Sequence, residues 1–92
     1  MKIIEKDDGR YWKTSSFNTS AYLLCKGFEL VNITPLDNPK KKEFVFCDRP
    51  EREQVLHNFS FSGEDDPEVM VDARKLILCI RVLKEKLYSN QF

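Results

Sequence analysis

The C-terminal part of the chain carries the pattern that most restricts its fold. Between residues 72 and 89, apolar side chains recur at spacings of three and four, the periodicity of one face of an α-helix. Asp72 is a favourable N-cap for this helix. A helix over 72–89 would be roughly 27 Å long, about the width of a small domain. The residues expected to face the core are Ala73, Leu76, Ile77, Ile80, Leu83 and Leu87.

Length and composition indicate one ordinary globular domain over residues 1–92. The chain is 41% hydrophobic and 33% charged, which is typical of soluble proteins. Its longest apolar run, residues 76–80, is far shorter than the ~18 residues of a membrane span. The start of the chain turns acidic at Asp7 and Asp8, too early for a secretory signal. We therefore expect no membrane partner, and a cytoplasmic location in a bacterial cell or an infected host.

Short β-rich segments predict a small sheet. Residues 2–5 and 10–17 are expected to form a hairpin around the tight-turn pair at 8–9. Residues 28–34 form a third candidate strand, whose imperfect alternation indicates burial on both faces or a bulge. Residues 43–47 are the next strand and would complete a long-looped hairpin.

A first helix is expected at about 19–26. Asn18 or Thr19 would cap it, and Phe17 would pack onto it from the preceding position. Gly27 stands where a left-handed residue commonly ends a helix.

A second helix is expected at about 50–59. Asp48 and Glu51 fit a capping box at its start. Residues 69–71 favour a short last strand, although the final helix could instead begin at Pro67.

These elements predict an α+β fold, a two-layer sandwich. A small, mostly antiparallel sheet of three to five strands would carry helices on one face, with a long C-terminal helix. Residues 1–10 would be either an N-terminal extension or a strand of the first hairpin.

The side chains that could carry metal or nucleophile chemistry are few and scattered. Cys25, Cys47, Cys79 and His57 fall on four separate elements, each cysteine inside an apolar run and none in a Cys-x-x-Cys pair. Buried structural thiols are the better interpretation. We therefore expect no metal, no cofactor and no catalytic residue, and hence no enzyme.

One alternative is nucleic-acid binding. The basic run Lys40, Lys41 and Lys42 precedes an aromatic strand, and Tyr11 and Trp12 lie on another. Basic groups that hold phosphates beside aromatic rings that stack on bases are typical of single-strand binding. The formal net charge is zero, which weakens this alternative.

The leading hypothesis is a protein-binding surface on the C-terminal helix. Leu78 and Val82 form an apolar strip offset from the core stripe, among basic residues that include Arg74 and Arg81. A helix that is apolar on more than one face is either deeply buried or docks a partner. In a chain of this length deep burial of the whole helix is difficult. A homodimer or a host protein is therefore the expected partner.

Several short stretches are spread over about three-quarters of the chain: Thr14–Ser16, Ala21–Leu23, Lys26–Phe28, Phe44–Asp48, Phe59, Ala73–Leu76, Leu83–Lys84 and Leu87–Tyr88. These stretches resemble a small domain family of unknown function found in bacteria and their phages. The resemblance implies a prokaryotic or viral source and a non-enzymatic default, and it transfers no catalytic residue.

Overall fold

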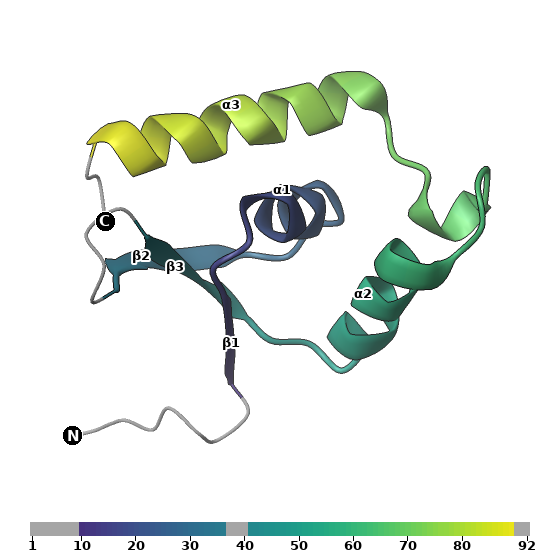
Figure 1. Cartoon of the computed structure of the whole chain (residues 1–92), viewed down its shortest axis with the longest axis horizontal. Coiled ribbons are helices and arrows are strands. Elements are labelled where there is room, and N and C mark those ends of the chain that lie inside the picture. Colours follow the sequence, from purple (N-terminus) through teal and green to yellow (C-terminus); the bar gives the residue numbers. More distant parts are fainter. Residues whose placement is uncertain (1–9, 37–40, 90–92) are drawn as a thin grey trace.

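The computed structural model describes residues 10–36 and 41–89, so the strand expected at 2–5 lies outside the described residues. The elements, in chain order, are β1 (Tyr11–Thr14), α1 (Phe17–Cys25), β2 (Leu30–Pro35), β3 (Lys42–Cys47), α2 (Arg52–Phe61), the 3₁₀-helix η1 (Pro67–Val69) and α3 (Ala73–Ser89) (Figure 1).

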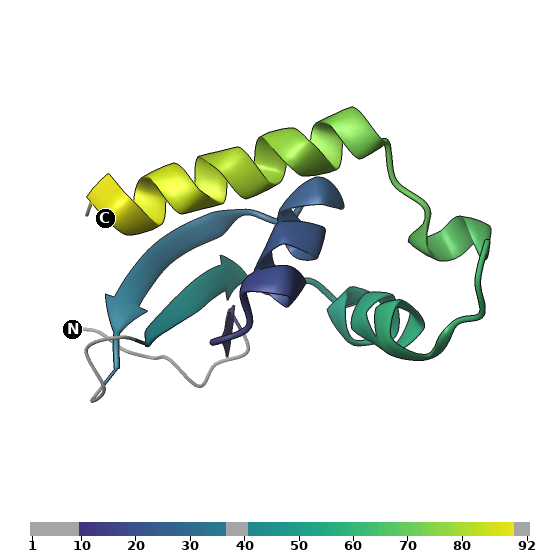
Figure 2. The same ribbon diagram turned by 45° about the horizontal axis from the view of Figure 1, so that its top comes forward.

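Within the described residues, the strands form one antiparallel sheet in the order β1–β3–β2. Helices α1 and α3 lie over the same face of this sheet, as Figures 1 and 2 show together. Helix α2 and η1 extend to one side of it (Figure 1). The predicted α+β fold, with a small antiparallel sheet and a long C-terminal helix, is confirmed.

The pairing register decides which strand residues reach the core. Trp12 of β1 pairs with Phe46 of β3, and Ile33 of β2 pairs with Phe44. Directly paired residues point to the same face of a sheet, so these four side chains share the core face. Phe44 and Phe46 are buried there. The buried apolar cluster as a whole consists of Ala21, Leu23, Phe28, Phe44, Phe46 and Leu83.

Strand β2 is an edge strand with an irregular register. The pairing with β3 shifts between Leu30 and Asn32, which leaves Val31 as the extra residue. Of the two expected explanations, burial on both faces or a bulge, the register shift identifies a bulge, which accounts for the two adjacent apolar residues Leu30 and Val31.

Helix α1 begins earlier than predicted. Its N-cap is Ser16, whose hydroxyl oxygen accepts a hydrogen bond from the backbone N–H of Thr19 at 3.1 Å. The expected cap at Asn18 or Thr19 was wrong because Ser16 already supplies the acceptor. Phe17 is consequently the first helical residue, and its ring packs edge-on against Phe44 with the ring centroids 6.4 Å apart.

Gly27 ends α1 in the predicted left-handed conformation, with φ of +94°. We expect Gly27→Ala to lower the free energy of unfolding by about 1–2 kcal/mol, the usual cost of this conformation for a residue with a Cβ. The added Cβ would lie 3.9 Å from the Arg49 side chain, an ordinary contact, so backbone strain alone causes the loss. Urea denaturation measures it. Gly63→Ala is the control, because no atom lies within 4 Å of its added Cβ; an equal loss in both variants would contradict the explanation.

The start of α2 also differs from the prediction. The helix covers Arg52–Phe61 rather than 50–59, and its N-cap Glu51 makes no side-chain cap bond. The Asp48 carboxylate is engaged by Arg52, whose Nε lies 3.0 Å from Oδ1, so the expected capping box does not form. The Arg52 guanidinium also lies over the Trp12 ring, 4.6 Å from its centroid. Together these contacts attach the start of α2 to β1.

Residues 69–71 do not form the strand that was favoured. Pro67–Val69 is a 3₁₀-helix, and the Asp66 side chain accepts a hydrogen bond from the backbone N–H of Glu68 at 2.9 Å. A cap residue followed by proline favours a helical turn over a strand. The final helix then begins at Ala73, and Asp72 Oδ1 accepts from the N–H of Arg74 at 2.8 Å, as its predicted cap role requires.

Helix α3 packs through a narrower stripe than predicted. Leu83 is fully buried, and Leu76, Ile80 and Leu87 pack against the same cluster. Ile77, expected in the core, has 57% of its surface exposed, and Ala73 is also exposed. The helix meets α1 and the sheet on its Leu83 side, which turns Ile77 toward solvent.

Candidate functional site: the outer face of α3

The outer face of α3 points away from α1 and the sheet (Figures 1 and 2). Its apolar members, Ile77, Leu78 and Tyr88, are 57%, 53% and 81% exposed. Surface apolar residues are common singly, but several on one helix face make a candidate docking surface. We define the α3 outer face as Arg74, Ile77, Leu78, Arg81, Lys84 and Tyr88.

The predicted partner residues lie together on this helix. Arg74, Leu78 and Arg81 are exposed, and Val82 is half-buried on the flank beside Leu78. Ile77 belongs to the same surface but was assigned to the core, because spacing alone does not show where the core stripe ends.

Positive charge dominates α3. The helix carries five Lys and Arg residues against one acidic residue, Glu85. Arg74 forms an ion pair with Asp72 at 3.7 Å, but its side chain is 94% exposed. Exposed pairs of this kind contribute about 0–1 kcal/mol, so the guanidinium can exchange Asp72 for another carboxylate.

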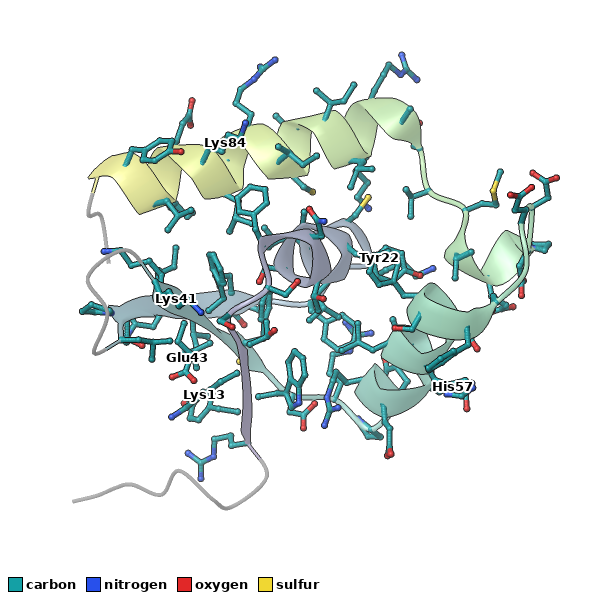
Figure 3. All side chains as sticks on the ribbon, viewed as in Figure 1. Lys13, Tyr22, Lys41, Glu43, His57 and Lys84 are labelled. Carbon is teal, nitrogen blue, oxygen red and sulfur yellow. The ribbon has the colours of Figure 1, made fainter. Side chains whose placement is uncertain are left out.

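Two surface pockets meet at Tyr88. One, of about 440 Å³, is lined by Ile77, Ile80, Arg81, Lys84, Glu85 and Tyr88. The other, of about 390 Å³, lies between the end of α3 and the sheet, and is lined by Ser15, Phe17, Lys41, Lys42, Phe44, Leu87 and Tyr88. Figure 3 shows Lys84 on the outer side of α3 and Lys41 at the end of the sheet. A ligand that contacts Tyr88 therefore has basic groups on both sides.

The structure separates the other residues considered for nucleic-acid binding. Lys40 lies outside the described residues. Tyr11 pairs with Cys47 at one end of β3, whereas Lys42 is at the other end, roughly 16 Å away at the usual strand rise. Trp12 points to the core face and is covered by Arg52. Tyr11 and Trp12 therefore do not form one stacking surface with Lys41 and Lys42.

The three cysteines are free thiols, one buried and two half-buried. Cys25 is buried, and burial together with the nearby Cys25 raises the pKa of the Cys79 thiol. Burial and the Glu29 carboxylate raise the pKa of the Cys47 thiol, which lies 3.7 Å from Glu29 Oε1. A raised pKa lowers the thiolate fraction, the form that acts as a nucleophile. Among residues 10–36 and 41–89, no group of three His, Cys, Asp or Glu side chains could hold a metal ion.

A second surface feature was not anticipated from the sequence. We call α2, η1 and the turn between them, residues 52–70, the acidic arm. Neither α2 nor η1 contains a fully buried residue, and Phe61 and Met70 are 75% and 59% exposed. The arm is attached to α1 through Tyr22, whose ring stacks on Phe59 with centroids 4.2 Å apart.

Within the described ranges, no helix combines the length and apolar character that crossing a membrane requires. Comparison with curated proteins and with solved structures finds no match. Residues 9–89 do match a described family, which covers β1 through α3 and therefore both the α3 outer face and the acidic arm. The chain belongs to the DUF5659 family of domains of unknown function.

Proposed function

We propose that this domain is a non-catalytic binding module whose α3 outer face docks an acidic, partly apolar segment of a partner protein. The supporting observation is the alternation along one exposed helix face of the apolar residues Ile77, Leu78 and Tyr88 with Arg74 and Arg81. Tyrosine and arginine are the residue types that most often dominate protein–protein interfaces. The charge of α3 favours a partner that carries carboxylates.

Nucleic-acid binding is the second candidate, and one observation favours it. Lys41 and Lys42 line the same pocket as Tyr88. A phosphate near the lysines and a base stacked on the exposed tyrosine ring would use this arrangement. The three apolar side chains of the outer face favour a protein instead, because nucleic-acid interfaces are more polar.

The resemblance to bacterial and phage domains supports a source in a bacterium, a phage or another mobile element. The three cysteines of the chain are all free thiols, and this supports a location in a reducing compartment such as the cytoplasm.

A peptide selection tests the proposed function. A displayed library of random 16-residue peptides is selected on the immobilised protein, and selected peptides are measured by fluorescence anisotropy. We expect them to combine Asp or Glu with large apolar residues. Leu78→Asp with Arg81→Glu should weaken their binding about 100-fold, because two interface residues at about 1–2 kcal/mol each are removed.

Lys13→Glu is the matched control, since it reverses one exposed charge on the opposite face of the sheet. This variant should leave peptide binding unchanged. In a parallel measurement, a mixed-sequence 20-nucleotide DNA tests the alternative ligand. Peptides that bind the double variant as tightly as the wild type would refute the α3 site. Binding of the DNA alone, lost at high salt, would replace the protein partner by nucleic acid.

A further inference from the structure

We infer that the segment docked by the α3 outer face is the acidic arm of a second copy of this chain, so that two copies form a reciprocal dimer. This inference rests on the proposed function and names the partner within it. It is carried by the chemical match between two exposed surfaces of the same molecule.

The acidic arm and the α3 outer face carry opposite charges. Residues 49–72 carry seven acidic against two basic side chains, whereas 73–89 carry five basic against one acidic. Both basic residues of the acidic segment are engaged internally, Arg49 with Glu51 and Arg52 with Asp48. The exposed carboxylates of the arm are therefore left to face outward, and they include Glu64, Asp65 and Glu68.

Exposed apolar side chains flank these carboxylates in the sequence. Phe61 precedes the acidic turn, and Met70 follows η1, both largely exposed. The turn has a defined shape, because Asp65 adopts a positive φ of 67° and the N–H of Asp66 donates to the carbonyl of Gly63. The arm thus presents the combination of negative charge and apolar surface that complements Arg81 and its apolar neighbours.

The arm cannot reach the outer face of its own α3. It lies to one side of the sheet beyond the N-terminal end of α3, while the outer face points away from the sheet (Figures 1 and 2). Its carbonyl at Glu68 is held by Lys26, whose Nζ donates at 3.1 Å, which ties the arm to the α1 side. The complementary surfaces therefore meet only between molecules.

In a reciprocal dimer, the arm and the α3 outer face of each copy are both in contact with the other copy. If each arm lies on the partner's α3, a two-fold axis relates the two contacts and the assembly closes as a dimer. Two such contacts together need to bury about 1,200–2,000 Å² to form a stable, specific interface.

Charge exchange tests this dimer. The mass of the full-length protein is measured by sedimentation velocity over a range of concentrations, at low and high salt. We expect twice the 10.9 kDa chain mass, with dissociation at high salt. Arg74→Glu/Arg81→Glu and Glu64→Lys/Glu68→Lys should each be monomeric, because each places like charges in both contacts. An equimolar mixture of the two variants should restore the dimer, since every contact then pairs opposite charges. Lys13→Glu is the control that stays dimeric.

The outcomes separate this inference from the proposed function. A wild-type protein that stays monomeric at every concentration overturns the dimer, while selected peptides can still bind α3. A dimer that survives both charge reversals places the contact elsewhere and also overturns it. Far-UV circular dichroism spectra of both variants should match that of the wild type, because all four substituted side chains are exposed and the fold of each chain is kept.

Discussion

Replacing Leu83 by alanine should lower the free energy of unfolding by about 2–5 kcal/mol, the range for a fully buried leucine. Leu83 has no exposed surface and is the α3 residue at the centre of the core cluster. A domain of this size has a total stability of about 5–15 kcal/mol, so the loss would be a large fraction of it. Urea denaturation followed by circular dichroism measures the change.

Leu78→Ala is the matched control, since it makes the same substitution on the opposite face of the same helix. Leu78 is 53% exposed, and alanine and leucine have similar helix propensities. At a protein concentration low enough for the chain to be monomeric, we expect a change within about 0.5 kcal/mol. Equal losses at the two positions would show that both faces of α3 are buried in the folded protein, and would contradict the outer face as described.

Replacing Tyr22 by alanine should cost about 3–5 kcal/mol, the range for a buried aromatic residue, and should release the acidic arm. Tyr22 is 4% exposed, and its ring stacks on Phe59 of α2 with an interplanar angle of 17°. The stacked pair joins the arm to α1. Hydrogen exchange should therefore quicken in residues 52–70 more than in β3.

Tyr22→Phe separates the ring from the hydroxyl. The hydroxyl donates to the carbonyl of Glu68 over 3.4 Å, a long hydrogen bond, so its loss should cost less than about 1 kcal/mol. The arm should keep its wild-type exchange rates in this variant. Faster exchange in the phenylalanine variant, equal to that in the alanine variant, would mean that the hydroxyl rather than the ring holds the arm.

The sequence predicted the elements better than their ends. The α3 periodicity was strong because four core residues recur over three turns, and Gly27 marked the end of α1 by its freedom to adopt positive φ. Caps were harder to place because several polar residues compete for each helix start. Ser16 is the N-cap, and the adjacent Phe17 packs against Phe44, a contact between elements that local sequence does not contain.

The candidate site was predicted in part for the same reason. Leu78 and Arg81 could be predicted because they lie outside the apolar stripe of α3 that faces the core. Ile77 did not, since it fits the helical period and only the docking angle of α3 turns it outward. The sequence alone contains the signal that Tyr11 and Trp12 lie on opposite faces of the sheet, because neighbouring residues in a strand point to opposite faces.

The bulge in β2 has a consequence for how copies of this domain can associate. Among the described residues, β1 and β2 are the outer strands of the sheet, and the outer edge of a strand can template aggregation through strand addition. Strand β1 is only four residues long, and β2 is interrupted after Leu30 and ends at Pro35, which has no N–H to offer. Neither edge is a long, regular template for another strand. The described edges of this sheet therefore disfavour fibre-like growth by strand addition.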